Sequence, residues 1–172
     1  MRVACRLVSS DQVENLLSED RTFDPSPEFA KQANVKADEY ERADTDRVAF
    51  WEEQAEYLKW DKRWHTVLDW QVPFAKWFVD GKLNASVNCL DRHVEEGRGD
   101  RVAFYFEGEP GDTRTITYTD LLTDVKKCAN ALTELGIKSG DRVAIYMPMI
   151  PEAAVAMLAC ARVGAAHSVV FG

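Results

Sequence analysis

The chain has 172 residues, of which 46% are hydrophobic and 29% charged, a composition typical of globular rather than disordered proteins. Its formal net charge of −8 argues against nucleic acids and anionic membranes as partners, since both bind clusters of lysine and arginine. Its apolar runs are too short for a membrane span, and the first residues lack the apolar core of a secretory signal. We therefore expect a cytoplasmic protein with no membrane partner.

The cysteines and histidines give no sign of a metal site or a catalytic pair. The cysteines are far apart, with no CxxC pair and no histidine at ligand spacing: Cys5, Cys89, Cys128 and Cys160. This pattern predicts reduced thiols and no zinc site. Three histidines stand near no candidate nucleophile and are interpreted as structural: His65, His93 and His167.

The first half of the chain has few regular patterns, and residues 1 to about 30 give little structural signal. A helix is predicted from about Thr45, its expected N-cap, because Val48, Trp51 and Ala55 recur at helical spacing. All five tryptophans lie between positions 51 and 77. We interpret them as anchors that dock an irregular segment onto a larger body. A ligand pocket and base stacking are the alternatives, and stacking lacks the cations that accompany it.

A second helix is predicted after a turn at Asp80–Gly81. It begins at about Ser86, carries an apolar stripe through Leu90, and ends at Gly97. Its charged residues predict a local polar network at a domain seam rather than a catalytic site: Asp91, Arg92 and His93. The arginines at 92, 98 and 101 alternate with acidic residues, which favours a solvated face over an anion-binding patch.

Regular α/β patterns begin after residue 100. Residues 101–107 and 113–119 predict two strands of a hairpin, joined by a turn at "GEPGD". An amphipathic helix follows, with an apolar stripe from Leu121 to Leu135 and Gly136 as its C-terminal glycine.

The last 31 residues predict a β-α-β unit. Residues 142–148 form an apolar strand, and a helix follows with Pro151 at its first position and Arg162 near its end. The helix is apolar on every side between these positions, and residues 166–172 predict a second, parallel strand. Because so apolar a unit needs covering layers, we expect further polypeptide of the same protein to bury it.

The fold class expected is therefore α/β. An aromatic-rich, helical and irregular extension (residues 1–97) precedes the first strands and helices of a larger, mostly parallel domain (residues 98–172).

Two blocks carry a specific family resemblance: "GKLNASVNCLDRH" at residues 81–93 and "MIPEAAVAMLACARVGAAHSVVFG" at residues 149–172. They resemble the N-terminal part of acetyl-CoA synthetases, the AMP-forming acetate–CoA ligases. The resemblance implies a two-step reaction in which acetate and Mg²⁺-bound ATP give acetyl-adenylate, and CoA then displaces AMP. Propionyl-CoA and related short-chain acyl-CoA synthetases share this architecture, and a short non-catalytic interaction module is the alternative from another class.

The resemblance transfers only one binding position to this chain. It places Phe171 and Gly172, after the last strand, near the nucleotide end of CoA. The sequence contains neither G-x-x-x-x-G-K-[ST] nor G-x-G-x-x-G, and the family's phosphate loop, adenine segment and catalytic lysine correspond to positions after Gly172. We therefore expect no catalytic residue within these 172 residues and no activity from them alone.

Overall fold

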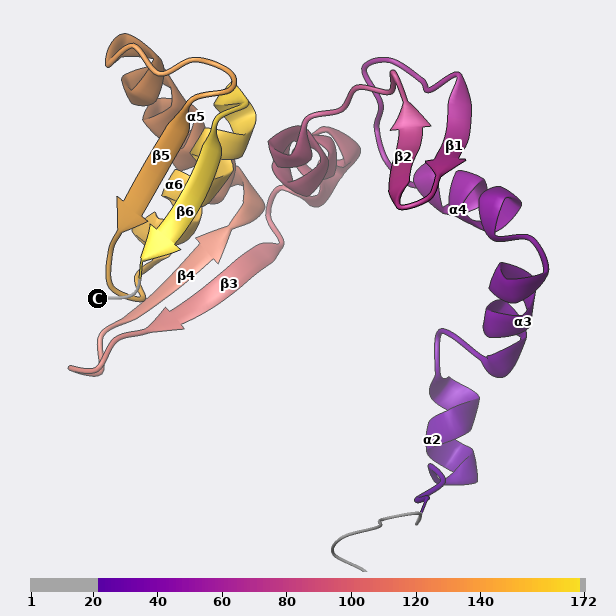
Figure 1. Cartoon of the computed structure of the whole chain (residues 1–172). Helices are drawn as coiled ribbons and strands as arrows, with labels where there is room; N and C mark the ends of the chain where they lie inside the picture. Colours follow the sequence, from indigo (N-terminus) through magenta and orange to yellow (C-terminus); the bar gives the residue numbers. More distant parts are fainter. Residues whose placement is uncertain (1–21, 171–172) are drawn as a thin grey trace, which may run out of the picture. The chain divides into compact units, whose positions relative to one another are not determined.

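The computed structural model of the protein describes residues 22–170 (Figure 1). The chain separates into two units, Met1–Thr45 and Asp46–Gly172. The described part of the first unit contains α2 (Pro27–Gln32) and α3 (Ala37–Thr45), and neither helix buries a residue. The hydroxyl of Ser26 caps α2 by accepting a hydrogen bond from the Phe29 N–H.

The helix expected from Thr45 exists, but its N-cap is a different residue. It is α4 (Arg47–Ala55), and the carboxylate of Asp46 accepts a hydrogen bond from the Ala49 N–H at 2.9 Å. Thr45 instead ends α3, where its hydroxyl donates to the Glu41 carbonyl. Asp46 has the non-helical backbone that an N-cap requires, so the prediction was one residue too early.

The tryptophan-rich segment forms a β-hairpin, where irregular structure was expected. Strands β1 (Thr66–Gln71) and β2 (Phe74–Val79) pair antiparallel around a two-residue turn at Val72–Pro73. Six-residue strands of aromatic and mixed residues lack the clean alternation that identifies a hairpin from sequence, and the turn has no Asn-Gly or Asp-Gly signal.

The rings of this segment pack on one another. Trp60, Trp64 and Phe78 have ring centroids 4.9–5.6 Å apart, and Trp64 is only 7% exposed. The Trp60 indole N–H donates to the Ala55 carbonyl at 2.8 Å, which ties the cluster to the end of α4. The anchors thus build a local core between α4 and the hairpin, while Trp70 is 52% exposed.

The helix predicted from Ser86 is present, with π-helical winding that no local pattern signalled. It contains η1 (Val87–Asp91) and η2 (Val94–Arg98). Leu90 is buried in the main hydrophobic cluster, as its stripe predicts. Gly97 has a φ of 77°, a left-handed conformation that interrupts the helix at the predicted position.

Strands β3 (Val102–Glu107) and β4 (Thr113–Thr117) form the predicted hairpin, and α5 (Tyr118–Glu134) follows. Thr117 and Asp120 make a reciprocal capping box at the start of α5. The predicted stripe packs into the core through Leu121 and Val125, but Leu135 is 80% exposed because it stands one residue past the last helical turn.

The β-α-β unit is formed as predicted. Strands β5 (Arg142–Tyr146) and β6 (Ala166–Val170) pair in parallel, and α6 (Pro151–Val163) connects them and packs beside α5 (Figure 1). Gly164 ends α6 with a φ of 83°, a left-handed conformation that favours glycine. The structure confirms a mixed α/β fold, consistent with the first part of an adenylate-forming domain.

Candidate functional site

The carboxyl ends of β5 and β6 lie together at one edge of the parallel sheet. Tyr146 pairs with Val170 at this edge, and the loop from Met147 to Ile150 leads from β5 into the first turn of α6. Ligands of open α/β sheets bind in the crevice outside such strand ends. Phe171 and Gly172, the predicted CoA-binding positions, come directly after β6 in the sequence and lie outside the described residues.

An apolar groove runs beside this edge. Its volume is about 440 Å³, and strand β3, the first half of α6 and β6 contribute its walls. The residues that shape it include Phe104, Phe106, Ile150, Ala154, Met157 and Val169. Met149 at its rim is 81% exposed. The predicted all-round burial of α6 is therefore not reached within residues 22–170, because nothing described covers this side of the helix.

A second, more polar cleft of about 650 Å³ lies between the β3–β4 turn and the β5–α6 loop. Arg114 is the described cation that lines it, and its guanidinium pairs with the Glu152 carboxylate at 2.6 Å. The hydrogen bond from Arg114 and one from the backbone at the start of α6 lower the pKa of Glu152. Because the other charged residues of the cleft are acidic, its lining does not suit a phosphate group: Glu107, Glu109 and Asp112.

Two of the histidines, His65 and His93, have structural partners. His65 lies 3.3 Å from the Asp80 carboxylate, and the His93 ring stacks edge-on against Tyr118. Burial raises the pKa of the Cys128 and Cys160 thiols, which makes both weak nucleophiles. Within residues 22–170 no group of three or more metal-ligating side chains is close enough to hold an ion.

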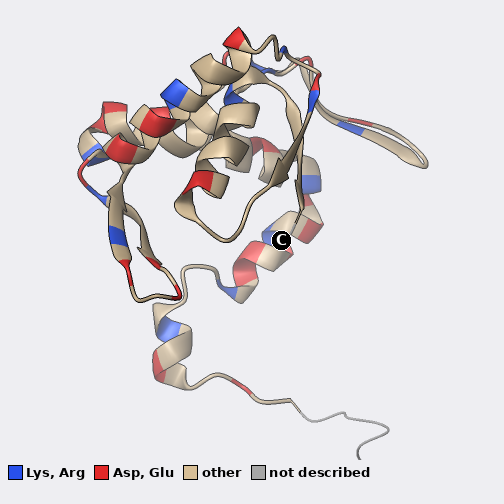
Figure 2. Cartoon of the chain, turned by 90° about the vertical axis from the view of Figure 1, so that its left-hand side faces the viewer, with Lys and Arg blue, Asp and Glu red and all other residues tan. Residues whose placement is uncertain are grey.

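Helix α3 is mostly acidic, with Asp38, Glu39, Glu41 and Asp44 against Arg42. On the other described elements, acidic and basic residues are interspersed (Figure 2). The Arg98 guanidinium pairs with Glu96, and Arg92 donates to the Tyr57 carbonyl. No helix in the described part of the chain is both long and apolar enough to cross a membrane.

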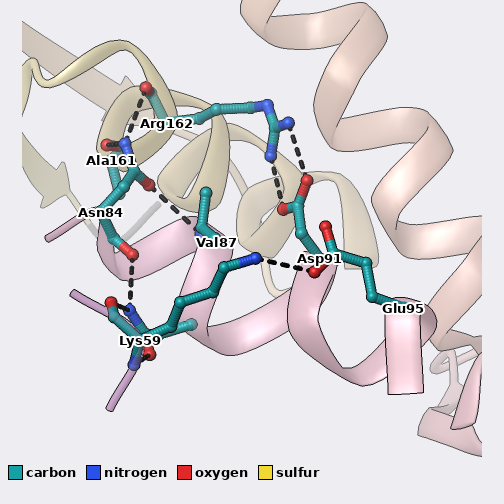
Figure 3. A network of polar contacts seen from close by, with 8 residues as sticks. Lys59, Asn84, Val87, Asp91, Glu95, Ala161 and Arg162 are labelled. Atoms are coloured by element: carbon teal, nitrogen blue, oxygen red, sulfur yellow. Dashed lines mark hydrogen bonds and ion pairs between the residues drawn. The ribbon is translucent and has the colours of Figure 1, made fainter. Parts of the chain in front are cut away.

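A polar network joins the π-helical segment to the end of α6 (Figure 3). The Arg162 guanidinium makes two hydrogen bonds to the Asp91 carboxylate, at 2.7 and 2.9 Å. Burial would raise the pKa of Asp91, but the hydrogen bonds and charge of Arg162 outweigh it, helped by Lys126, and the pKa is lowered. Asp91 does take part in a polar network, but its partner is Arg162, 71 residues away, and not the predicted Arg92 and His93.

Two asparagines extend this network, and sequence reasoning missed both. The Asn84 amide donates to the carbonyls of Ala161 and Arg162, at 3.3 and 3.0 Å. Asn88 exchanges two hydrogen bonds with the backbone of Lys59, at 2.8 and 2.9 Å. These contacts depend on tertiary structure, because 77 residues separate Asn84 from Ala161.

Two family models match the chain and meet end to end. The model described as "Acetyl-coenzyme A synthetase N-terminus" matches residues 37–89, and that of the "AMP-binding enzyme" family matches residues 90–172. The junction falls inside η1, among the residues of the polar network. The second match and the fold relate residues 90–172 to the AMP-binding enzymes.

Three of the similar curated proteins carry the same name. The acetyl-coenzyme A synthetases of Streptomyces avermitilis and Streptomyces coelicolor are 62% and 61% identical over 166 residues, which cover 96% of this chain and 26% of each relative. The Mycobacterium tuberculosis enzyme of the same name is 60% identical over 153 residues, or 88% of this chain and 24% of the relative. These similarities support an N-terminal acetyl-coenzyme A synthetase segment, and the chain spans about a quarter of the length of these relatives.

Proposed function

We propose that this chain supplies the N-terminal part of an acetate–CoA ligase. The reaction makes acetyl-CoA from acetate, ATP and CoA through acetyl-adenylate, and it releases AMP and pyrophosphate. One observation carries the proposal: relatives named for this synthetase are 60–62% identical over most of the chain, across both family models. The AMP-binding family supports ATP as the nucleotide, and we propose Mg²⁺ and CoA as the further cofactors and the cytoplasm as the compartment.

The described residues have a supporting role in this proposal. Residues 1–97 are the extension, and residues 98–172 begin the adenylate-forming domain. Further polypeptide, corresponding to the other three quarters of the relatives, covers the apolar groove and supplies the phosphate and adenine sites. The exposed Met149 and the open side of α6 support this, because a soluble protein gains free energy by burying such a surface.

Phe171 and Gly172 are the proposed contribution to CoA binding. They follow β6 at the edge where the carboxyl ends of both parallel strands meet. A glycine after a strand lets a ligand approach the backbone closely.

A chimeric enzyme tests the proposal. Residues 1–172 replace the aligned quarter of the S. avermitilis synthetase, and acetate- and CoA-dependent AMP formation is measured. We expect activity within about tenfold of the parent enzyme, because 62% identity over 166 residues preserves most buried contacts. Propionate is compared with acetate as substrate. A soluble, folded chimera without ligase activity on either acid would overturn the proposal.

The open groove favours one second candidate, a non-catalytic module that acts by binding a separate chain. The chain alone and the chain mixed with the remaining three quarters of the S. avermitilis enzyme discriminate between the two. Both candidates predict no activity from the chain alone, but only the ligase proposal predicts AMP formation when the chain is combined with the remaining three quarters. Tight binding to the intact parent enzyme, together with an inactive chimera, would favour the module.

A further inference from the structure

The C-terminal end of α6 is held by residues from outside the β-α-β unit. The last carbonyls of a helix have no donor within the helix, and Asn84 donates to two of them, those of Ala161 and Arg162. The Asn84 side-chain oxygen accepts from the Val87 N–H at 3.2 Å, which fixes the orientation of the amide (Figure 3). Both ends of this side chain are therefore engaged.

The Asp91–Arg162 pair holds the same end of the helix from a second direction. Its two hydrogen bonds join η1 to the last turn of α6, and the Asp91 side chain is 13% exposed. A cation near a helix C-terminus also interacts favourably with the helix dipole. We call Asn84, Asp91 and Arg162 the α6 clamp.

The clamp acts where α6 leads into β6, and α6 also packs against α5 and against the parallel sheet. After Gly164 the chain enters β6, and β5 is the only strand of the described chain that pairs with β6. The Ala166 N–H donates to the Asp141 carbonyl, which fixes the start of the strand to the turn before β5. The pairing with β5 and the clamped end of α6 therefore act together on the position of β6.

We propose that the α6 clamp positions β6 so that its carboxyl end binds CoA, and that its members are positioning residues rather than catalytic ones. This inference rests on the proposed ligase function. The inference gives the residues at the junction of the two family matches a role in the second half-reaction, in which CoA displaces AMP. The first half-reaction, formation of acetyl-adenylate, does not use CoA and depends less on the clamp.

The decisive variants are made in the chimeric enzyme. Asn84→Asp keeps the acceptor for Val87 but puts a carboxylate oxygen against the helix carbonyls, so it weakens the clamp more than Asn84→Ala. The matched control is Asn130→Asp, the same change at an exposed position of α5. Asp91→Asn and Arg162→Lys are milder changes that preserve size and keep the test possible if Asn84→Asp does not fold.

We expect the clamp variants to raise the KM for CoA about three- to tenfold and to leave acetate-dependent ATP–pyrophosphate exchange within about twofold. Asn130→Asp should change neither. An equal loss of both half-reactions would mean that the clamp contributes only to the overall stability of the enzyme, and this would overturn the inference. An unchanged KM for CoA would overturn it as well.

Hydrogen exchange on the 172-residue chain gives a readout that does not depend on activity. Asn84→Asp and Asp91→Asn should speed amide exchange in residues 161–170, with little change in β3 and β4. If the unsubstituted chimera is inactive, the proposed function fails while this measurement still tests the clamp. Unchanged exchange in residues 161–170 would show that the clamp does not hold β6.

Discussion

The aromatic segment between α4 and β2 and the β5–α6–β6 unit bury apolar surface in opposite ways. In the first, Trp60, Trp64 and Phe78 close a small core among themselves. In the second, the alanine-rich α6 buries one side against α5 and the sheet and leaves an apolar groove on another. A few large aromatic rings can bury one another and form a small core. A helix with small side chains on every face is fully buried only when other elements pack against each of its sides.

This difference separates local stability from assembly. Removing a ring from the aromatic core takes away contacts that no neighbour replaces. Changing an exposed residue of the groove removes little from the chain itself and alters what the groove can bind. Substitutions in the aromatic core should therefore mainly lower the stability of the chain. Substitutions in the groove should have smaller effects on stability and mainly alter binding.

The largest effect is expected from Trp64→Ala. This ring is nearly buried and contacts both other members of the aromatic core, so its loss should lower the free energy of unfolding by about 3–5 kcal/mol. Chemical denaturation followed by circular dichroism measures the change. Trp70→Ala is the matched control, because its half-exposed ring should cost less than about 1 kcal/mol. Equal losses would contradict a core centred on Trp64.

The Asp91–Arg162 pair should rank second. Asp91→Ala removes two charge-assisted hydrogen bonds and leaves the guanidinium without its anion, so we expect a loss of about 2–3 kcal/mol. The Arg114–Glu152 pair is the comparison, since its side chains are far more exposed and its coupling should stay below about 1 kcal/mol. Double-mutant cycles on the two pairs measure both coupling energies. A smaller coupling for Asp91–Arg162 would contradict the clamp.

The same pair predicts a pH dependence of defined sign. The pKa of Asp91 is lowered in the folded chain, so its contribution to stability is complete above its ordinary value of 3.8 and is lost as pH falls through the lower folded value. Asp91→Asn removes that contribution at every pH. The difference in unfolding free energy between the two chains should therefore be constant from pH 7 to about 5 and shrink below pH 4. A difference that grew on acidification would rule this out.

The second half of the molecule could be predicted from sequence because its signals are local. The stripe of α5, Pro151 at the start of α6 and Gly164 at its end each determine structure within a few residues. The β1–β2 hairpin was missed because ring packing, rather than alternation or turn chemistry, holds it together. The link from Asn84 to Ala161 could not be predicted, since neither residue carries a local sign of a partner 77 positions away.

The smallest effect on stability, and the sharpest contrast with Trp64, is expected in the groove. Met157→Gln replaces a partly exposed side chain by a polar one of similar length, so the free energy of unfolding should change by less than about 0.5 kcal/mol. Binding of a hydrophobic dye to the chain should fall, and association with the remaining three quarters of the S. avermitilis enzyme should weaken. If Met157→Gln instead destabilised the chain as much as Trp64→Ala, α6 would be covered by the chain's own residues, and the contrast between a closed aromatic core and an open groove would not hold.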